Sequence, residues 1–270
     1  MIKKRRQLDY VAKISAAVES EKSATRELQA QAERLAARAA REIYEVWGKS
    51  ESEIERLEIH RLAIEGKEGA IAAAVGSRLA NSWNQGNRYR ETVAICRQTL
   101  EIWEDRQISH ALAYAEDDLG EIENCLVNYQ RAIDLCPESE QKELATLMHN
   151  KAIVLHNKGN VDGAIALYEE SLQIQRAIGN QQGIAATLHE IATVYRNQGN
   201  VDRAIELYEE SLQIERAIGN VQGIASTLAM LAQIIVVHQQ DFGMCDDLRS
   251  VVDHRLSPAL RSHSSSHCFS

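Results

Sequence analysis

Apolar residues recur through most of the chain at spacings of three and four, the period of an α-helix with one buried face. The pattern begins within residues 3–47, at Leu8, Val11, Ile14, Val18, Leu28, Leu35, Ala39, Ile43 and Val46. No glycine or proline interrupts this segment. It therefore predicts one long helix or a tight helical hairpin near residues 21–23. Strict heptads do not persist through it, which disfavours a long coiled coil.

The triplet Gly48-Lys49-Ser50 then breaks the pattern. Ser50 is the expected N-cap of a helix that continues to residue 65, because Glu53 follows it at the spacing of a capping box. Gly66 is expected to end this helix, since glycine adopts the backbone conformation of a helix terminus without strain.

From residue 69 onward the same period predicts a series of helices separated by glycine, asparagine or proline. Their expected ranges are 69–85, 90–105, 107–119, 121–136, 140–158, 161–177, 181–198, 201–217, 221–238 and a degenerate 241–256. We therefore expect four parts in this chain. They are an N-terminal helical segment (1–66), an array of about four helix-pair repeats plus a degenerate fifth (67–240), a C-terminal capping helix (241–257) and a disordered, Ser/His-rich tail (258–270).

A Gly-Asn pair recurs every 20 residues, beginning at Gly159, Gly179, Gly199 and Gly219, and each pair follows a helical stretch. The sequence between these pairs repeats with a period of 40 residues. Segments 161–180 and 201–220 differ only at Gly163/Arg203, Ala166/Glu206 and Gln175/Glu215. Such a period indicates stacked supersecondary units and not one closed globule. Asn200 or Asp202 is the expected cap of the helix that follows.

Composition supports an all-α chain, because aromatic residues make up 5% and there are only two prolines. The net charge of −9 and the pI of about 5.5 argue against a nucleic-acid partner. The basic start, residues 3–6, is interpreted as a solvated helix end, with a localisation or anionic-surface signal as the alternative. No apolar run long enough for a signal peptide or a membrane helix is visible. Five cysteines without CxxC spacing indicate reduced thiols, so we expect a cytoplasmic protein.

One set of large and small residues recurs within the period. In residues 185–218 it consists of Leu188, Ile191, Ala192, Tyr195, Gly199, Ala204, Tyr208 and Ser211. This set resembles the signature of the tetratricopeptide repeat, and residues 72–105, 106–139 and 145–178 carry related versions. The later repeats resemble the 40-residue subclass of kinesin light chains and bacterial multi-repeat proteins. Over residues 72–240 the resemblance implies a right-handed α-solenoid of antiparallel helix pairs.

The resemblance also implies a concave groove, lined by the first helix of each pair, that binds a protein or peptide. The polar residues expected to face this groove are His110, His149, Asn150, His156, Asn157, His189, Glu190, Arg196 and Asn197. Asparagine amides both donate and accept, so a row of them can pair with the backbone of an extended peptide. The alternative is a polar, solvated helix face without a ligand.

Candidate chemistry is sparse. His110, His149 and His189 are spaced about 40 residues apart, too far for one metal ion, and His263, His267 and Cys268 lie in the predicted tail. The acidic pairs at 169–170 and 209–210 recur at one repeat position, which favours a solvated face over catalysis. Phosphate-binding loops and nucleophile elbows are missing. We therefore expect no catalytic residue, metal or cofactor.

The leading hypothesis is a non-enzymatic adaptor. One alternative is a regulatory sensor whose residues 1–66 form an effector module gated by a peptide in the repeats, and another is the repeat portion of a larger signalling protein. The last repeat helix places Val236 and Val237 where the preceding repeat has Arg196 and Asn197. These valines are expected to be covered by the 241–256 helix, by a partner or by further repeats.

Overall fold

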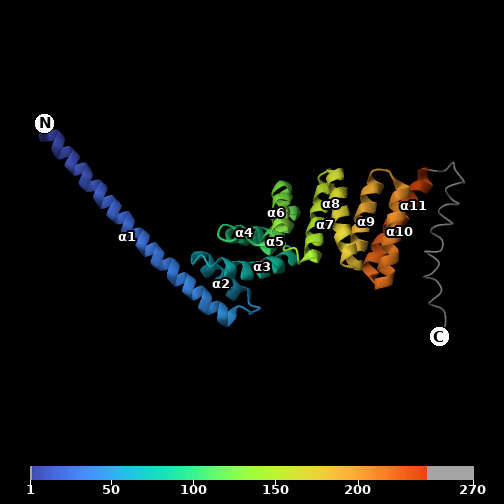
Figure 1. The fold of residues 1–270 in the computed structure, drawn as a ribbon, viewed down its shortest axis with the longest axis horizontal. Helices are drawn as coiled ribbons and strands as arrows, with labels where there is room; N and C mark the ends of the chain where they lie inside the picture. The colour runs from blue at the N-terminus through green and yellow to red at the C-terminus, as the bar shows by residue number, and fades with distance from the viewer. Residues whose placement is uncertain (1, 242–270) are drawn as a thin grey trace. The chain divides into compact units, whose positions relative to one another are not determined.

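The computed structural model describes the backbone of residues 2–241, together with the side chains of residues 25–234 and of Val236. Within this range the chain is all-α, as predicted (Figure 1). The helices are α1 (Ile2–Trp47), α2 (Glu53–Glu65), α3 (Gly69–Gln85), α4 (Tyr89–Leu100), α5 (Arg106–Asp118), α6 (Ile122–Asp134), α7 (Gln141–Asn157), α8 (Val161–Ala177), α9 (Gln181–Asn197), α10 (Val201–Ile218) and α11 (Val221–Asp241). The predicted capping helix and tail lie outside the described residues.

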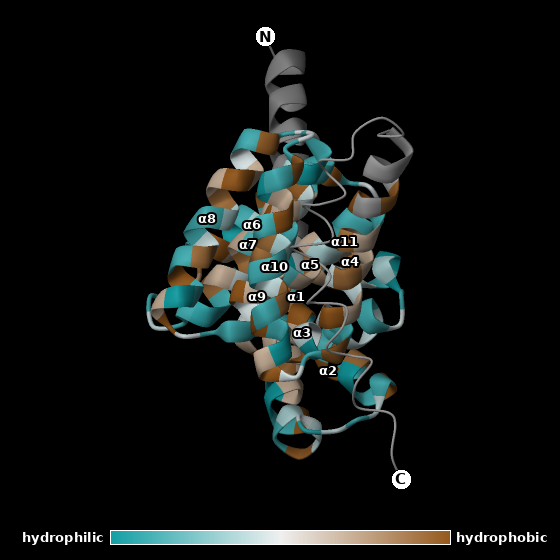
Figure 2. Cartoon of the chain, turned by 90° about the vertical axis from the view of Figure 1, so that its right-hand side faces the viewer, coloured by the Kyte–Doolittle hydropathy of each residue, from teal (hydrophilic) through white to brown (hydrophobic). Residues whose placement is uncertain are grey.

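The chain divides into two compact units, residues 1–140 and residues 141–270. Unit 1 contains α1–α6 and unit 2 contains α7–α11. Both are built from antiparallel helix pairs that expose polar positions and bury apolar ones, and Figure 2 shows the two kinds of residue alternating along each helix. None of the described helices combines the length and the apolar character needed to span a bilayer.

Of the two predicted alternatives for the N-terminal segment, one long helix or a hairpin near residues 21–23, the structure has the one long helix. No residue there favours a turn over the helix. The C-terminal part of α1 packs on α2, where Ala37 and Ala40 are buried and the backbone of Gly66 lies against Ala37. A larger residue at 66 would collide with the α1 backbone. Glycine at this position therefore both ends α2 and allows it to approach α1 closely.

The N-cap of α2 is also corrected. Ser52, and not Ser50, caps the helix, since its hydroxyl accepts a hydrogen bond from the Glu55 amide at 3.4 Å. Ser50 lies two residues earlier, and its hydroxyl accepts from the Ser52 amide at 3.0 Å. Glu53 is the first residue of the helix and therefore cannot complete the capping box that the spacing suggested.

Unit 2 reproduces the predicted pairing of large and small residues. Ala164 and Ala204 are fully buried, and the rings of Tyr168 and Tyr208 fill the space beside them. A serine in each second helix then binds the first helix of its own pair. The Ser171 hydroxyl donates to the Ala145 carbonyl at 2.7 Å, and the equivalent Ser211 donates to the Ala185 carbonyl at 2.8 Å. Two equivalent contacts thus set the register of both pairs.

The Gly-Asn pairs act as predicted at the helix ends of unit 2. Gly159, Gly179, Gly199 and Gly219 all have positive φ, and asparagine caps the helix that follows. Of the two caps expected before α10, Asn200 is the one used, because its side chain accepts from the Arg203 amide. At Gly86-Asn87 the left-handed residue is instead Asn87, with φ 58°, and Arg88 is the N-cap residue of the helix that follows.

This difference predicts opposite effects for two glycine substitutions. Gly199 has φ +80°, and no atom lies within 4 Å of the place that a Cβ would take, so Gly199→Ala adds backbone strain alone. We expect it to lower the free energy of unfolding by about 1 kcal/mol. Gly86 has φ −91°, and a methyl group there would make only ordinary contacts at 3.6 Å. Gly86→Ala is therefore expected to be neutral or stabilising by about 0.5 kcal/mol.

Urea unfolding followed by circular dichroism measures both effects. A loss of stability for Gly86→Ala as large as that for Gly199→Ala would contradict the assignment of the left-handed residue.

Candidate functional site

The helices that the sequence predicted to line a groove do meet one another in unit 2. We call α7, α9 and α11 the first helices and α8 and α10 the second helices. Asn197 of α9 lies with its amide nitrogen 3.3 Å from His156 Nε2 of α7. His149 of α7 bonds through Nδ1 to the Thr187 hydroxyl of α9 at 3.0 Å. The first helices therefore lie side by side and share polar contacts.

The next step of the array repeats this arrangement. His189 of α9 bonds through Nδ1 to the Thr227 hydroxyl of α11 at 2.9 Å. Its ring stands edge-on to Tyr208 with centroids 5.2 Å apart, and His149 does the same to Tyr168 at 5.5 Å. Each histidine thus packs between two repeats, and its Nδ1 forms a hydrogen bond with a threonine hydroxyl of the next first helix.

Burial keeps these two histidines uncharged. It lowers the pKa of His149 to about 4, and it also lowers that of His189, where Arg196 adds a smaller effect. Neutral rings at pH 7 can each donate from one nitrogen and accept at the other. The sequence predicted their position on the first helices correctly, but it gave no sign of their partners, because His149 and Thr187 are 38 residues apart.

The His149 contact belongs to a buried polar chain. The Gln175 amide of α8 donates to the Thr187 hydroxyl at 3.2 Å and to the Ser171 hydroxyl at 2.9 Å. Since Ser171 donates onward to the Ala145 carbonyl, the chain links α7, α8 and α9. The Thr187 hydroxyl accepts the bond from Gln175, and its own proton remains available for donation to His149 Nδ1.

In the next repeat Glu215 occupies the position of Gln175 and changes this pattern. Its carboxylate accepts from the Thr227 hydroxyl, while Oε2 is buried without a hydrogen-bond partner. Burial raises the pKa of Glu215, and the bond from Thr227 opposes part of that rise. Because Thr227 gives its only proton to the ionised glutamate, it must accept from His189 Nδ1. Thr227 is thereby restricted to accepting from its histidine, a restriction that Thr187 does not have.

The remaining predicted residues lie at the edges of these contacts. Asn157 and Asn197 are exposed, and Asn150 and Glu190 are half-buried. Arg196 donates from Nη1 to Met230 Sδ at 2.8 Å and to Gln233 Oε1 at 3.3 Å, both on α11. These partners are neutral, and in the described part of the chain no acidic side chain pairs with Arg196.

His110 lies in unit 1, apart from the other eight predicted residues, which all belong to α7 and α9. Its ring is 5.9 Å from that of Tyr129. This ring contact matches the histidine–tyrosine contacts of unit 2, so the same packing of a histidine on a tyrosine recurs in a more divergent repeat.

Comparisons with known proteins agree with this architecture. The model of the tetratricopeptide repeat family matches residues 143–217 and 183–242. Residues 143–242 therefore consist of tetratricopeptide repeats. Within them Gly159 and Gly199 mark a 40-residue spacing.

Solved structures show the same fold at low sequence identity. Aspartyl phosphate phosphatase F from Bacillus subtilis has a TM-score of 0.60 at 13% identity, covering 77% of this chain and 56% of that one. A MamA protein has a TM-score of 0.52 at 15% identity, covering 67% of this chain and 94% of that one. Repeats of a putative kinesin light chain from Podosopora anserina have a TM-score of 0.47 at 21% identity, covering 71% and 98%. No curated protein matches by sequence.

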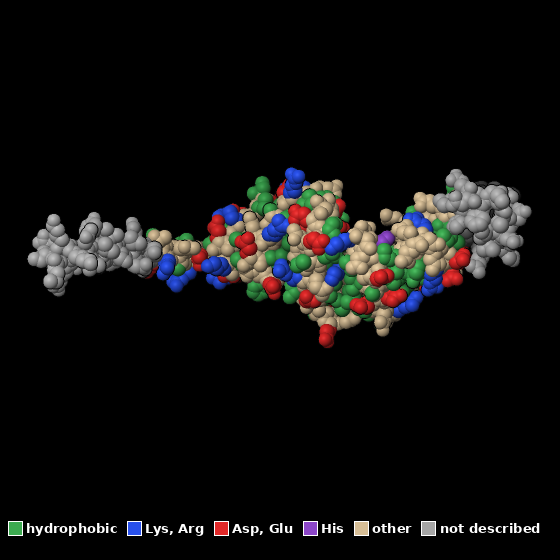
Figure 3. Space-filling model, turned by 90° about the horizontal axis from the view of Figure 1, so that it is seen from above, with side chains coloured by type: hydrophobic (Ala, Val, Ile, Leu, Met, Phe, Trp, Pro, Cys, Tyr) green, Lys and Arg blue, Asp and Glu red, His purple; other side chains and the backbone are tan. Residues whose placement is uncertain are grey.

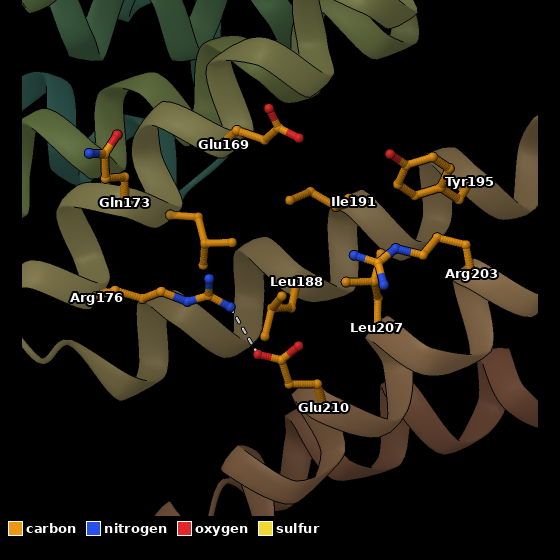
Figure 4. Close-up of a pocket in the computed structure, with 10 residues that line it drawn as sticks. Glu169, Gln173, Arg176, Leu188, Ile191, Tyr195, Arg203, Leu207 and Glu210 are labelled. Carbon is orange, nitrogen blue, oxygen red and sulfur yellow. Dashed lines mark hydrogen bonds and ion pairs between the residues drawn. The ribbon is translucent and has the colours of Figure 1, made fainter.

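The tetratricopeptide repeats also have an outer cleft that sequence reasoning missed. A cavity of about 390 Å³ lies between α8 and α10, with Leu188, Ile191 and Tyr195 of α9 as its floor (Figure 4). Arg176 and Glu210 form an ion pair of 2.9 Å between its two walls. Glu210 belongs to one of the repeated acidic pairs. That repetition was the available signal, and it marks an ion pair between second helices.

Unit 1 has a cleft at the equivalent place. A cavity of about 490 Å³ lies between α4 and α6 above α5, and Arg97 of α4 pairs at 2.7 Å with Glu121, the N-cap residue of α6. Elsewhere on the surface acidic and basic side chains are interspersed, as the face in Figure 3 shows. Among the residues with described side chains, no three His, Cys, Asp or Glu gather as a metal site.

The contrast between Gln175 and Glu215 gives a testable prediction. Glu215→Gln restores the amide of the preceding repeat and removes a buried charge, so we expect about 1 kcal/mol of added stability at pH 7. Because burial raises the pKa of Glu215, its ionisation destabilises the fold as the pH rises. The gain should therefore shrink as the pH falls toward about 4.3, the pKa of an unfolded glutamate.

Denaturant unfolding at several pH values measures this gain, with the exposed Glu170→Gln as the charge-matched control. Nitrogen NMR gives a second measurement at pH 8, because His189 should change from the Nδ1–H to the Nε2–H tautomer in Glu215→Gln. An unchanged tautomer would show that Thr227 does not direct its proton to Glu215.

Proposed function

We propose that this protein is a non-enzymatic adaptor that holds an extended peptide, or a helix of a partner protein, against the first helices α7, α9 and α11. The observation that carries the proposal is the repetition of exposed amides along one face. Asn157 and Asn197 occupy equivalent places on α7 and α9, and both are exposed. His156 and Arg196 precede them at equivalent places as well.

The contacts of these groups are suited to exchange for a ligand. The bonds from Asn197 to His156 and from Arg196 to the Asn197 oxygen are both 3.3 Å long, at the weak end of the normal range. A peptide backbone offers carbonyl oxygens and amides at regular intervals, and each asparagine can bond to both. Arg196, held by neutral partners, keeps its full charge for a carbonyl or a carboxylate.

The same groups do not favour catalysis. The Nδ1 atoms of His149 and His189 are hydrogen-bonded to threonine hydroxyls, and both rings are neutral. Neither histidine lies in a nucleophile–base–carboxylate arrangement. The net charge of −9 supports a protein partner over a nucleic acid. We place the adaptor in the cytoplasm, because Cys96 and Cys125 are free thiols in the core and burial raises the pKa of Cys125 to about 12.

The contacts of α1 and α2 bear on the alternative of a gated sensor. Arg41 pairs with Glu68 at 3.0 Å, and Lys67 pairs with Glu33 at 3.0 Å. His60 of α2 also bonds to the buried Thr99 hydroxyl of α4 at 2.8 Å. These contacts support a structural extension of the repeats, so we favour an adaptor over a sensor with a separable effector module.

The double variant Asn157→Ala/Asn197→Ala tests the proposal. Each lost hydrogen bond costs about 1 kcal/mol, so we expect affinity for a bound peptide to fall about thirty-fold. The measurement is fluorescence anisotropy with labelled peptides selected from a random library on the wild-type chain.

Gln173→Ala/Gln213→Ala is the matched control. These two amides are also exposed and 40 residues apart, but they lie on the second helices. Equal loss of affinity in both double variants, or no loss in the first, would argue against binding at the first helices.

A further inference from the structure

Glu190 is the one acidic residue among the predicted groove residues, and within the described range the fold gives its charge no basic partner. It lies on α9, half-buried, and burial raises its pKa. Across the described residues it has neither an ion pair nor a hydrogen bond. Arg196, the nearest cation along the helix, is turned to Met230 and Gln233 of α11. A carboxylate kept partly out of water without a partner is costly to the protein alone.

A second unpaired group lies near it. The Tyr168 side chain of α8 is fully buried, and its hydroxyl has no hydrogen-bond partner among the described residues. The Tyr168 ring stands edge-on to His149, and His149 bonds to Thr187 of α9, about one helical turn before Glu190. Burial raises the pKa of this phenol, and the charge of Glu190 adds to that rise. A buried hydroxyl of this kind is uncommon in folded proteins and needs an explanation.

The neighbouring repeat shows why the Tyr168 hydroxyl has no hydrogen-bond partner in the described chain. Its equivalent, Tyr208, lies 2.8 Å from the Thr193 hydroxyl of α9. The place of Thr193 is taken by Ile153 in the preceding repeat, and isoleucine offers no polar atom. The same repeat has Asn150 where α9 has Glu190. Two residue differences between otherwise similar repeats thus leave one carboxylate and one buried phenol oxygen without hydrogen-bond partners in the part of the chain that is described.

The position of Glu190 on α9 directs it toward α7. It precedes Asn197 by seven residues, two helical turns, so both lie on the same side of the helix. Asn197 contacts His156 of α7. Glu190 therefore belongs to the row of polar groups proposed to hold the peptide and contributes the only side chain of that row that can carry a negative charge.

We propose that Glu190 and the Tyr168 hydroxyl form the subsite for a basic side chain, lysine or arginine, of the peptide bound along the first helices. This inference rests on the proposed function. The carboxylate would neutralise the cation, and the phenol oxygen, which is buried in the free protein, would accept a second N–H from a side chain that inserts beside Glu190. An acidic side chain would face Glu190 with like charge, and an apolar one would leave both protein groups without partners.

Peptide libraries with one fixed residue test the proposal on the full chain. Labelled eleven-residue libraries carry lysine, arginine, norleucine or glutamate at the centre and random residues elsewhere, and binding is measured by fluorescence anisotropy. We expect the wild type to prefer lysine or arginine over norleucine about ten-fold, and glutamate to bind weakest.

Three variants locate this preference. Glu190→Gln should bind all four libraries at the norleucine level, and Tyr168→Phe should reduce the preference about three-fold, since it removes one neutral acceptor. Glu169→Gln makes the same change in charge at the exposed outer cleft and should behave as wild type. Circular dichroism confirms folding, which Glu190→Gln should not impair because it removes an unpaired charge.

Two results would overturn the inference and leave the adaptor standing: peptides that bind the wild type without a basic preference, or a preference that persists in Glu190→Gln. Failure of every library to bind the wild type would instead overturn the proposed function, and the basic subsite with it.

Discussion

The close approach of two helices at Ala164, and again at Ala204, is the contact on which the rest of unit 2 depends. A fully buried alanine lets the backbones of a helix pair come together, and a tyrosine one turn later fills the remaining volume. The serine that follows binds a carbonyl of the first helix and fixes the register. With both pairs built alike, equivalent residues of successive first helices come to lie on one face. The row of polar groups is a consequence of this packing.

The polar contacts between repeats are as regular as the apolar ones. A histidine, a threonine 38 residues later and a glutamine or glutamate from the intervening second helix form one chain at each step. Such a chain stabilises the fold only if its members are satisfied. Gln175 donates two bonds to its neighbours and Glu215 can only accept, while each leaves one buried oxygen without a partner among the described residues. The side chain at this place in the second helix thus determines whether the threonine can donate to the histidine of the first helix.

The helix order and most helix ends were predictable, because glycine and asparagine mark them locally and the apolar period identifies each buried face. The N-cap at Ser52 was not, since two serines compete there and hydrogen bonding decides between them. For the candidate site, the sequence was sufficient to assign eight of its residues to the helices α7 and α9. What His149 and His189 contact was hidden, because each partner lies in another repeat. The outer clefts were hidden for the same reason, as their walls come from two second helices.

Sequence repetition makes the exceptions informative. Where two repeats agree, the shared residue is explained by packing, as for Ala164 and Ala204 or for Tyr168 and Tyr208. Where they differ at a buried or half-buried polar position, the packing is unchanged and only the hydrogen-bonding capacity differs. Asn150 against Glu190 and Ile153 against Thr193 are differences of this kind. They leave the helix packing intact while leaving a carboxylate on α9 and a buried hydroxyl on α8 without partners within the described chain. A repeat protein can therefore acquire a preference for one kind of ligand side chain at positions where a substitution does not change the packing of its helices.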